Sequence, residues 1–566
     1  MNLFFWKNKK KKHNKEIEPD EIFLDSSNLP HFDVNQFEGR LEKPISLRSF
    51  YFLCGVFILI LFVVFSKVWI LQVRDGEMYV KKSENNRLKN SLIFSERGVI
   101  NDRNNVPLVW NTVNPEDENY SLRKYIDLNG FANLLGYVKY PTKDNAGIYW
   151  NESYDGKDGV EKFYNSSLTG KNGVQVIETD ALGNIQSSYK IEPPQEGQTL
   201  TLTIDSNVQN KLYEIISETA RKVSFQGGAG IIMNIKTGEV LAITTFPEYN
   251  SNVLSDGSDS KEINAYLKNK NNPFLNRVSS GLYTPGSIVK PYVALGALKE
   301  GIITPEKKIL STGSISIPNL YDKSKPSVFR DWKAHGWVDM RQAIAVSSDV
   351  YFYEIGGGFQ DQKGLGIYNI DKYIRMFGMG EEVKGFFNGP KGTIPTPEWK
   401  LENFQNEPWR VGDTYLTAIG QYGFQVTPAQ MVRAVAAIAN GGKLLDPILT
   451  KQEYFILNEK TVDIPLSDFE VVREGMRKGV MPGGTAQALN VPGVNVAAKT
   501  GTAELGAKKD FVNSWVTGFF PYEKPEWAFA IVMERGPKTN LIGAPYVMNQ
   551  MLTWMVKNAK EYTKSD

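Results

Sequence analysis

The chain has 566 residues, of which 41% are hydrophobic, and this length predicts two or three folded units rather than one domain. Its 65 basic and 63 acidic residues leave a formal net charge of +2, so no charge excess indicates nucleic acid as a partner. Cys54 is the only cysteine, which excludes an intrachain disulfide, a thiolate zinc cluster and an iron–sulfur site. Of three histidines only His335 lies beyond the apolar stretch around Cys54, so a Ser-His-Asp triad would have to use it, and a centre built mainly on imidazoles is excluded.

The first predicted element is a membrane-spanning helix at residues 50–71. This stretch, FYFLCGVFILILFVVFSKVWIL, carries one charge, at Lys67. At helical rise it spans roughly 33 Å, which is one bilayer crossing and longer than most buried core helices. A cleaved signal peptide would have a shorter apolar core and a small-residue cleavage site, whereas QVRDGEMY follows here. We therefore predict an uncleaved anchor.

The charges around this span do not settle its orientation. Nine Lys or Arg residues precede it, and several follow it closely: Arg74, Lys81, Lys82, Arg87 and Lys89. Long downstream domains translocate regardless of their charge, so we expect a cytoplasmic amino terminus and an extracytoplasmic remainder. The tail at residues 1–49 mixes charges with few aliphatic residues, which predicts a mostly disordered segment.

Two folded regions are predicted after the span. Residues 72–203 contain short apolar runs broken by Gly, Asn and Asp, a pattern typical of strands and turns, and so predict a β-rich spacer. At about residue 204 the alternation of TLTLTI changes to a helical pattern that Asp205 or Ser206 can cap. Residues 204–566 then mix strands and helices, which indicates an α+β domain.

A Ser-x-x-Lys pair occurs three times, and its surroundings decide between the copies. Ser187 with Lys190 lies in the spacer, and Ser258 with Lys261 lies in the polar loop SDGSDSKE, so both copies are predicted to be surface residues. Ser287 with Lys290, in YTPGSIVKPYVALGALKEG, follows a Pro-Gly turn and begins an apolar helix. One turn apart, the two side chains share a face, where a buried neutral lysine can accept the serine proton. An isolated pair of this kind is more often an N-cap serine and a solvated lysine, so other motifs must support it.

Two further motifs follow the serine. RQAIAVSSDVYFYEIGG places Ser347 and Asp349 two residues apart at the end of a predicted helix. Lys-Thr-Gly occurs twice, and the copy at 236–238 is predicted to be the turn of a hairpin. The copy at 499–501 lies on a predicted strand, where the glycine would let substrate backbone approach closely. The order Ser-x-x-Lys, Ser-x-Asp, Lys-Thr-Gly is the one that a penicilloyl-serine transferase fold requires.

With these motifs the chain resembles the class B penicillin-binding proteins, the monofunctional transpeptidases of bacterial wall synthesis. The likeness covers nearly everything after the span. It implies a penicilloyl-serine transferase (β-lactamase-like) transpeptidase domain at 204–566, and a membrane-proximal pedestal or dimerisation-type domain at 72–203. It rests on TPGSIVKP, AAKTGTAE, AIGQYGFQVTPAQM, ENNR at 84–87, RGVINDRN at 97–104, GKDGVEKFYNSSLTGKNG at 156–173 and GGTA at 483–486.

The resemblance implies a role for each motif residue in D,D-transpeptidation. Ser287 would attack the carbonyl between the two terminal D-alanines of a stem peptide and form an acyl-enzyme, and Lys290 would take its proton. Ser347 would pass a proton to the leaving amine, and Lys499 would add positive field nearby. Thr500, Gly501 and Thr502 would bind the substrate, with the backbone N–H groups of Ser287 and Thr502 as the oxyanion hole.

Two positions depart from the pattern of relatives. Asp349 stands where many have Asn, and because an ionised Asp accepts but does not donate, we expect it to stabilise Lys290. The Asp form together with ENNR resembles the elongation branch, the penicillin-binding protein 2-like members. Some of these hold zinc near DWK...GHG. DWKAHGW here keeps Asp331 and His335 but is shorter, so we predict no metal and no cofactor.

The implied partners are stem peptides ending in D-Ala-D-Ala, β-lactams, a SEDS-family glycan polymerase and a wall-elongation complex in the inner membrane, and not nucleic acid. A division-specific transpeptidase remains an alternative. The long spacer and the span argue against a serine β-lactamase. A catalytically silent scaffold would be expected to lose a motif, and a β-lactam sensor would need a signalling output.

Overall fold

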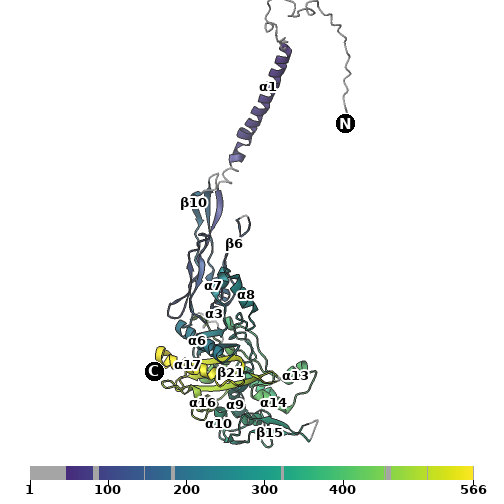
Figure 1. The fold of residues 1–566 in the computed structure, drawn as a ribbon, viewed down its shortest axis with the longest axis vertical. Helices are drawn as coiled ribbons and strands as arrows, with labels where there is room; N and C mark the ends of the chain where they lie inside the picture. Colours follow the sequence, from purple (N-terminus) through teal and green to yellow (C-terminus); the bar gives the residue numbers. More distant parts are fainter. Residues whose placement is uncertain are drawn as a thin grey trace, which may run out of the picture. The chain divides into compact units, whose positions relative to one another are not determined.

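The computed structural model describes residues 46–564, apart from 81–87, 146, 180–184, 320–323, 452, 454–459 and 507 (Figure 1). Most of the tail predicted to be disordered lies outside the described residues, as does the motif ENNR. The chain divides into two units, residues 1–89 with 178–184 and residues 90–177 with 185–566.

The first unit contains a long apolar helix. Helix α1 runs from Leu47 to Trp69, and Ser46 caps it by accepting a hydrogen bond from the Ser49 N–H. A π-helical turn, Ile70–Arg74, continues it. The 28 residues Leu47–Arg74 bury no side chain inside the structure, and their length and the mean hydropathy of 2.6 in an 18-residue stretch within them suit a membrane span. The helix therefore includes the predicted span at 50–71 and differs from a buried core helix.

The amino-terminal part of the second unit consists of short strands and one-turn helices. One sheet has the order β1-β9-β10 and another the order β11-β2-β3-β4, in which β11 and β2 are parallel. β5 pairs with β8, and β6 pairs with β7. The strands are β1 Leu88–Ile93, β2 Ile100–Asn101, β3 Pro107–Thr112, β4 Leu122–Tyr125, β5 Val138–Lys139, β6 Thr142–Lys143, β7 Tyr149–Asn151, β8 Asp155–Gly156, β9 Gly173–Thr179, β10 Ile185–Glu192 and β11 Leu200–Thr201. The helices are α3 Ala132–Leu135, α4 Gly159–Phe163 and α5 Asn165–Leu168.

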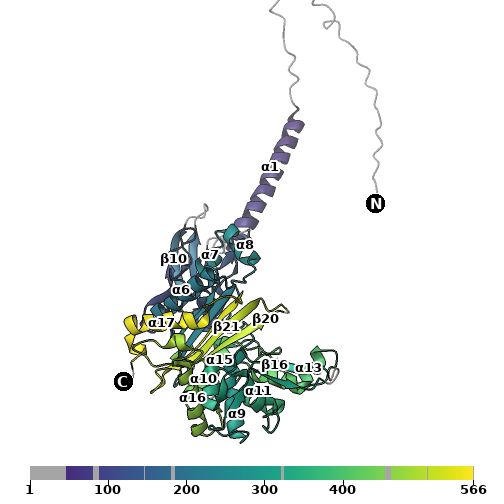
Figure 2. The same ribbon diagram turned by 60° about the horizontal axis from the view of Figure 1, so that its bottom comes forward.

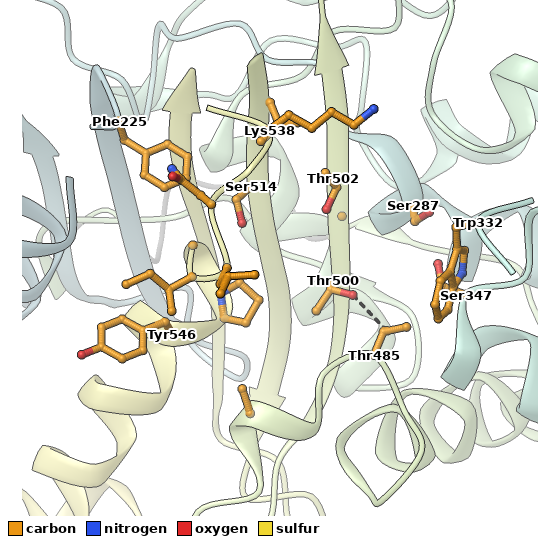
Figure 3. A pocket seen from close by; sticks show the side chains of 18 of the residues that line it. Phe225, Ser287, Trp332, Ser347, Thr485, Thr500, Thr502, Ser514, Lys538 and Tyr546 are labelled. Carbon is orange, nitrogen blue, oxygen red and sulfur yellow. Dashed lines mark hydrogen bonds between the residues drawn. The ribbon is translucent and has the colours of Figure 1, made fainter. Parts of the chain in front are cut away.

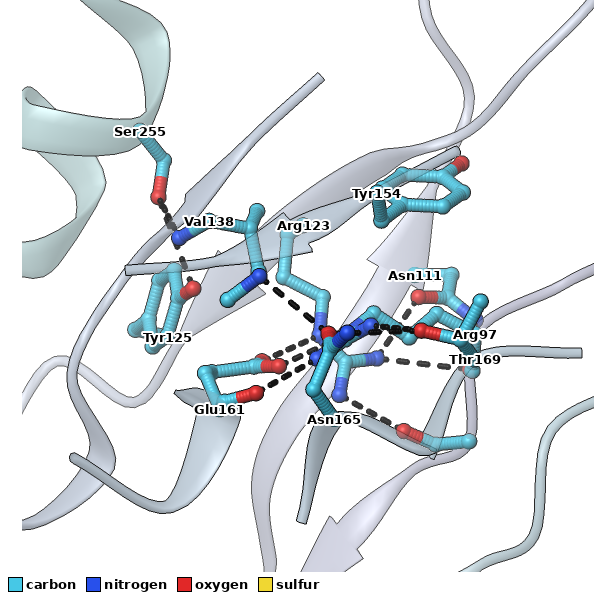
Figure 4. A network of polar contacts seen from close by, with 12 residues as sticks. Arg97, Asn111, Arg123, Tyr125, Val138, Tyr154, Glu161, Asn165, Thr169 and Ser255 are labelled. Atoms are coloured by element: carbon cyan, nitrogen blue, oxygen red, sulfur yellow. Dashed lines mark hydrogen bonds and ion pairs between the residues drawn. The ribbon is translucent and has the colours of Figure 1, made fainter. Parts of the chain in front are cut away.

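A buried ionic cluster holds this region together (Figure 4). We call Arg97, Arg123 and Glu161 the pedestal cluster. Arg97 Nε donates to Glu161 Oε2 at 2.6 Å and Arg123 Nε donates to Oε1 at 2.8 Å, and all three side chains are 0% exposed. The guanidinium groups also donate to Thr169 Oγ1 at 2.7 Å and Asn111 Oδ1 at 2.8 Å. Because Arg97 begins RGVINDRN and Glu161 lies in GKDGVEKFYN, the cluster explains why these motifs carry charged residues.

The centre of the rest of the second unit is a five-stranded antiparallel sheet of order β13-β12-β22-β21-β20 (Figure 2). Alternate residues of each strand face opposite sides, so Ile231 belongs to one hydrophobic core and Ile232 to the other. Helices α6 and α17 pack on one face, and α15 and α16 pack on the other. The strands are β12 Gly227–Asn234, β13 Val240–Phe246, β20 Ala497–Leu505, β21 Phe511–Phe520 and β22 Trp527–Pro537.

The remaining elements surround this sheet. Two-stranded antiparallel sheets pair β14 with β17, β15 with β16 and β18 with β19. These strands are β14 Ile309–Ser311, β15 Ser314–Ile317, β16 Ser327–Arg330, β17 Gly336–Val338, β18 Lys443–Leu444 and β19 Lys460–Thr461. The helices are α6 Ser206–Lys222, α7 Ser251–Asp256, α8 Ser260–Lys268, α9 Lys290–Lys299, α10 Met340–Val346, α11 Asp349–Gly357, α12 Ile367–Met376, α13 Pro397–Asn403, α14 Val411–Ala418, α15 Pro428–Ala439, α16 Leu466–Val480 and α17 Ala544–Asn558.

The first Lys-Thr-Gly copy is a turn, as the sequence predicted. It lies between β12 and β13, and Gly238 has a φ of +78°. A Cβ at Gly238 would come within 2.6 Å of the Asp446 carbonyl oxygen, so both the backbone angle and the space require glycine. Lys236 is exposed and lies 3.5 Å from Glu526 Oε1.

Candidate active site

The Ser287 side chain lies in a tight turn before the apolar helix rather than inside that helix. Residues Gly286–Val289 form one turn of 3-10 helix, and Lys290 is the first residue of α9. Gly286 has a φ of +59° and donates its N–H to the Gly420 carbonyl at 3.0 Å. A Cβ on Gly420 would lie 2.3 Å from the Gly286 carbonyl oxygen, so glycine in AIGQYG lets the two loops touch. Ser287 is therefore held in a rigid turn that packs against a second motif.

Gly501 admits the loop that carries Ser287. A Cβ at this position would come within 2.7 Å of the Pro285 carbonyl oxygen. The sequence suggested that the missing side chain lets substrate approach, and the structure gives a different reason, because the close neighbour is the enzyme's own backbone. Trp515, paired with Gly501 across β20 and β21, is fully buried and donates its indole N–H to the Thr284 carbonyl at 3.0 Å.

The turn between α10 and α11 brings two motif residues to Lys290. Ser347 ends α10 in the left-handed region, with a φ of +59°, a conformation that non-glycine residues rarely adopt. The chain reverses there, so that Asp349 begins α11. Lys290 Nζ then donates to Asp349 Oδ1 at 2.6 Å and to the Ser347 carbonyl at 2.8 Å, and lies 3.3 Å from Ser347 Oγ. The carboxylate compensates the complete burial of the lysine.

Lys499 approaches the same serine from the sheet. Its Nζ lies 2.8 Å from Ser347 Oγ and 2.9 Å from the Thr500 carbonyl oxygen. Burial holds the pKa of Lys499 well below its usual range, the nearby Lys290 charge lowers it further, and Asp349 opposes the shift. The lowered pKa weakens the positive field that the resemblance implied for Lys499.

A groove of about 810 Å³ opens beside these residues (Figure 3). Because strand residues alternate, Thr500 and Thr502 point to the groove. Lys499 points to the opposite side of β20, toward Ser347 at the end of α10. The groove continues past these threonines to the end of β22 and the start of α17. It is lined by Ser287, Trp332, Ser347, Asp349, Thr485, Thr500, Gly501, Thr502, Ser514, Lys538, Leu541 and Tyr546, among others.

Thr485 is a groove residue to which the sequence analysis gave no role. Its Oγ1 lies 2.9 Å from Thr500 Oγ1 (Figure 3), and it belongs to the motif GGTA. Trp332 also lines the groove, with 60% of its surface exposed. The motifs GGTA and DWKAHGW were the signals for these two residues, but neither shows which side chain faces the groove.

The other candidate residues are not among those that line the groove. Lys190 is exposed on β10, and Lys261 is exposed on α8. Asp331 and His335 are neighbours, with His335 Nε2 3.5 Å from Asp331 Oδ1. Within the part of the chain that the structure describes, no group of three or more His, Cys, Asp and Glu side chains is arranged to hold a metal ion.

Comparison with known proteins places this geometry in a family. The family model for the penicillin binding protein transpeptidase domain matches residues 228–552, and that for the penicillin-binding protein dimerisation domain matches residues 116–202. The peptidoglycan D,D-transpeptidase MrdA of Salmonella typhimurium strain SL1344 is 26% identical, over 93% of this chain and 98% of the relative.

Two solved structures have the same fold. The complex between PBP2 and MreC from Helicobacter pylori gives a TM-score of 0.67 at 26% identity, over 84% of this chain and 99% of that chain. A peptidoglycan synthase complex, described as coordinating polymerization and crosslinking, gives a TM-score of 0.69 at 25% identity, over 92% of this chain and 99% of that chain. The chain belongs to the penicillin-binding protein transpeptidase family, as a class B member of the elongation (PBP2-like) type.

Proposed function

We propose that this chain is a peptidoglycan D,D-transpeptidase of cell elongation and shape maintenance. It crosslinks stem peptides through an acyl-enzyme on Ser287 and is a target of β-lactams. The observation that carries the proposal is the contact of Lys290 and Lys499 with one serine hydroxyl, Ser347 Oγ, at 3.3 and 2.8 Å, at the edge of the groove that Ser287 lines. Membership of the family supports the same reaction.

The two lysines accept and pass on protons in the first step, in which Ser287 loses its hydroxyl proton. Burial favours a neutral Lys499, whose free lone pair can accept a proton from Lys290 through Ser347 Oγ, against the pull of the Lys290–Asp349 ion pair. This transfer leaves Lys290, three residues from Ser287, as the neutral base that takes the Ser287 proton. Ser287 Oγ then forms a bond to the carbonyl carbon of the penultimate D-alanine. The bond to the terminal D-alanine breaks, and Ser347 delivers the proton to the leaving amine.

The groove face of β20 binds the substrate in this proposal. Thr500 and Thr502 hydrogen-bond the terminal carboxylate and the peptide backbone, and Thr485 orients the Thr500 hydroxyl from 2.9 Å. β20 is the outer strand of its sheet, a place where an extended peptide can add. The backbone N–H groups of Ser287 and Thr502 stabilise the oxyanion, a contribution of about 3 to 4 kcal/mol per donor in other serine hydrolases.

The second step transfers the acyl group. An amine on a neighbouring stem peptide attacks the ester carbonyl, the new amide bond forms, and Ser287 recovers its proton. The part of the groove that continues toward Lys538 and Tyr546 offers room for this second peptide.

The chain acts at a membrane with partners of the same pathway. The apolar helix Leu47–Arg74 anchors it once in the inner membrane, with a cytoplasmic amino terminus and an extracytoplasmic transpeptidase domain. Its partners are a SEDS-family glycan polymerase and a wall-elongation complex. The likeness to a peptidoglycan synthase complex and to a PBP2 held by MreC supports these partners.

The test is labelling of the full chain in detergent with a fluorescent penicillin. The wild type is expected to form a long-lived adduct, because the ester to Ser287 resists water, and Ser287→Ala is expected to lose it completely. Ser258→Ala, which alters another Ser-x-x-Lys copy, is the matched control and should label like the wild type. Short-lived labelling with release of hydrolysed drug would instead indicate a β-lactamase. Absence of labelling in folded wild type would leave a silent scaffold.

A further inference from the structure

We propose that Asp331 is a positioning residue that holds the turn carrying Ser347 and Asp349 in its reactive geometry. The inference rests on the proposed transpeptidase function and adds to it a residue outside the three motifs. Asp331 lies in the loop between β16 and β17, and its side chain is 0% exposed.

The Asp331 carboxylate accepts hydrogen bonds from the start of helix α11. Its Oδ2 accepts hydrogen bonds from Ser348 Oγ at 2.9 Å and from the Val350 N–H at 3.0 Å. These two donors are the residues on either side of Asp349 in the chain. Asp331 therefore fixes the backbone around the carboxylate that holds Lys290, without touching the groove chemistry itself.

The remaining acceptor positions of the carboxylate are also used. Ser311, at the end of β14, donates its hydroxyl to Oδ2 at 3.2 Å, and the Trp332 N–H donates to Oδ1 at 2.8 Å. An ionised carboxylate has about four acceptor positions and no donor. Because donors from β14, from the β16–β17 loop and from α11 meet on this one group, it ties three segments of the chain together.

These hydrogen bonds from Asp331 matter because the turn at Ser347 is strained. Ser347 adopts a φ of +59°, which costs free energy in a residue with a side chain and persists only where neighbours enforce it. Ser348 follows it, is fully buried and caps α11 by accepting the Tyr351 N–H at 3.3 Å. If Asp331 released Ser348, the turn could relax and move Ser347 Oγ away from the two lysines.

Asn is the sharpest substitution for Asp331, because it keeps the shape and loses the charge. Its amide nitrogen is a donor, so it would face donors already aimed at a carboxylate oxygen. The full chain is compared as wild type and Asp331→Asn, with the fluorescent penicillin, separating the acylation rate from the drug affinity. We expect the acylation rate to fall about 100-fold, with the affinity changed little, since misplaced reacting groups cost on that order.

Two variants separate positioning from general damage. Ser311→Ala removes a donor to the same carboxylate and a 3.1 Å contact with Ser348 Oγ, but it keeps the bonds from Ser348 and from the Val350 N–H to Asp331, so it is expected to slow acylation less than Ser348→Ala does. Ser348→Ala removes the hydroxyl that links Asp331 to the turn and is expected to slow acylation about tenfold, in line with the loss of a helix cap. The double variant Asp331→Asn with Ser348→Ala should be no slower than Asp331→Asn alone, because both changes break one link.

Labelling with excess penicillin counts the sites that can be acylated and so measures the folded fraction of each variant. If Asp331→Asn lost labelling only in proportion to its unfolded fraction and its folded fraction acylated at the wild-type rate, the positioning role would be wrong. If Asp331→Asn failed to fold, a wild-type rate in Ser348→Ala would overturn the inference. A wild type that is not labelled at Ser287 would instead remove the proposed function.

Discussion

Two of the buried charge clusters in the described part of the chain differ in how completely their charges are paired. In the pedestal cluster, Arg97 and Arg123 each donate to Glu161, and all three side chains are 0% exposed. In the active-site cluster, which we define as Lys290, Ser347, Asp349 and Lys499, only Lys290 bonds a carboxylate, and Asp349 is 18% exposed toward the groove.

The difference separates structural charge from reactive charge. In the pedestal cluster two guanidinium groups surround one carboxylate, and this pairing holds segments of the chain together. Lys499 instead contacts a hydroxyl and a carbonyl oxygen, and burial lowers its pKa. Incomplete pairing thus leaves a proton that can move, whereas complete pairing fixes it.

Lys499→Ala is expected to have the largest effect of the variants that sharpen this comparison. It removes the amine that receives the proton through Ser347, so acylation by penicillin should fall roughly 10²–10⁴-fold. The wild-type rate should also fall as the pH is lowered, because Lys499 then becomes an ammonium group. Stopped-flow or gel-based labelling across pH measures both effects, and a variant rate within threefold of the wild type would contradict this role.

Glu161→Gln tests the pedestal cluster. It leaves Arg97 and Arg123 buried without a full countercharge, which is expected to lower the free energy of unfolding by about 3 to 5 kcal/mol. Denaturant unfolding of the full chain in detergent measures the loss. The folded fraction should still acylate at the wild-type rate, because the cluster does not reach the groove. Unchanged stability would remove the distinction between the two clusters.

Glu248→Gln tests a carboxyl that joins two parts of the second unit. Glu248 accepts the N–H groups of Gly130 at 2.6 Å and Ala132 at 3.0 Å, and burial raises its pKa from 4.5 to about 7. Between these values the unfolded chain loses the proton while the folded chain keeps it, so stability falls as pH rises, by on the order of 3 kcal/mol.

Thermal unfolding at pH 5 and pH 8 checks this sign. The difference in melting temperature between wild type and Glu248→Gln should shrink or reverse as the pH rises, because the variant has no proton to lose. An equal pH slope in both proteins would show that Glu248 does not titrate in this window.

Lys236→Ala has the smallest expected effect and is the matched partner of Lys499→Ala. Lys236 belongs to an identical Lys-Thr-Gly triplet but is exposed on a turn. We expect less than about 0.5 kcal/mol of lost stability and no change in labelling. A clear loss of labelling would mean that the turn copy, too, influences the reaction.

Much of the candidate site could be found in the sequence because its motifs are short and local. Ser287 and Lys290 lie one helical turn apart, Ser347 and Asp349 lie at a helix junction, and residues 499–501 lie on a strand. Helix and strand patterns reach only a few residues, so they can place each motif on an element and choose the turn copy of Lys-Thr-Gly as structural.

The roles that the sequence missed, those of Thr485 and Asp331, depend on contacts between distant segments. Thr485 meets Thr500 from a loop, and Asp331 reaches the start of α11 from the loop between β16 and β17. Nothing in GGTA or DWKAHGW indicates which neighbour each side chain contacts, since that depends on how separate elements pack.

The amino-acid sequence by itself determined the apolar span, the order of the motifs, the α+β class and the family to which the chain belongs. Each of these depends on hydrophobic patterns and motifs within short stretches of sequence. Tertiary structure alone decided that Lys499 and Lys290, 152 and 57 residues from Ser347, meet at one hydroxyl. It also lowers the pKa of Lys499 through burial. Burial and charge pairing set the proton affinity of an amine, and both depend on segments that only the folded chain brings together.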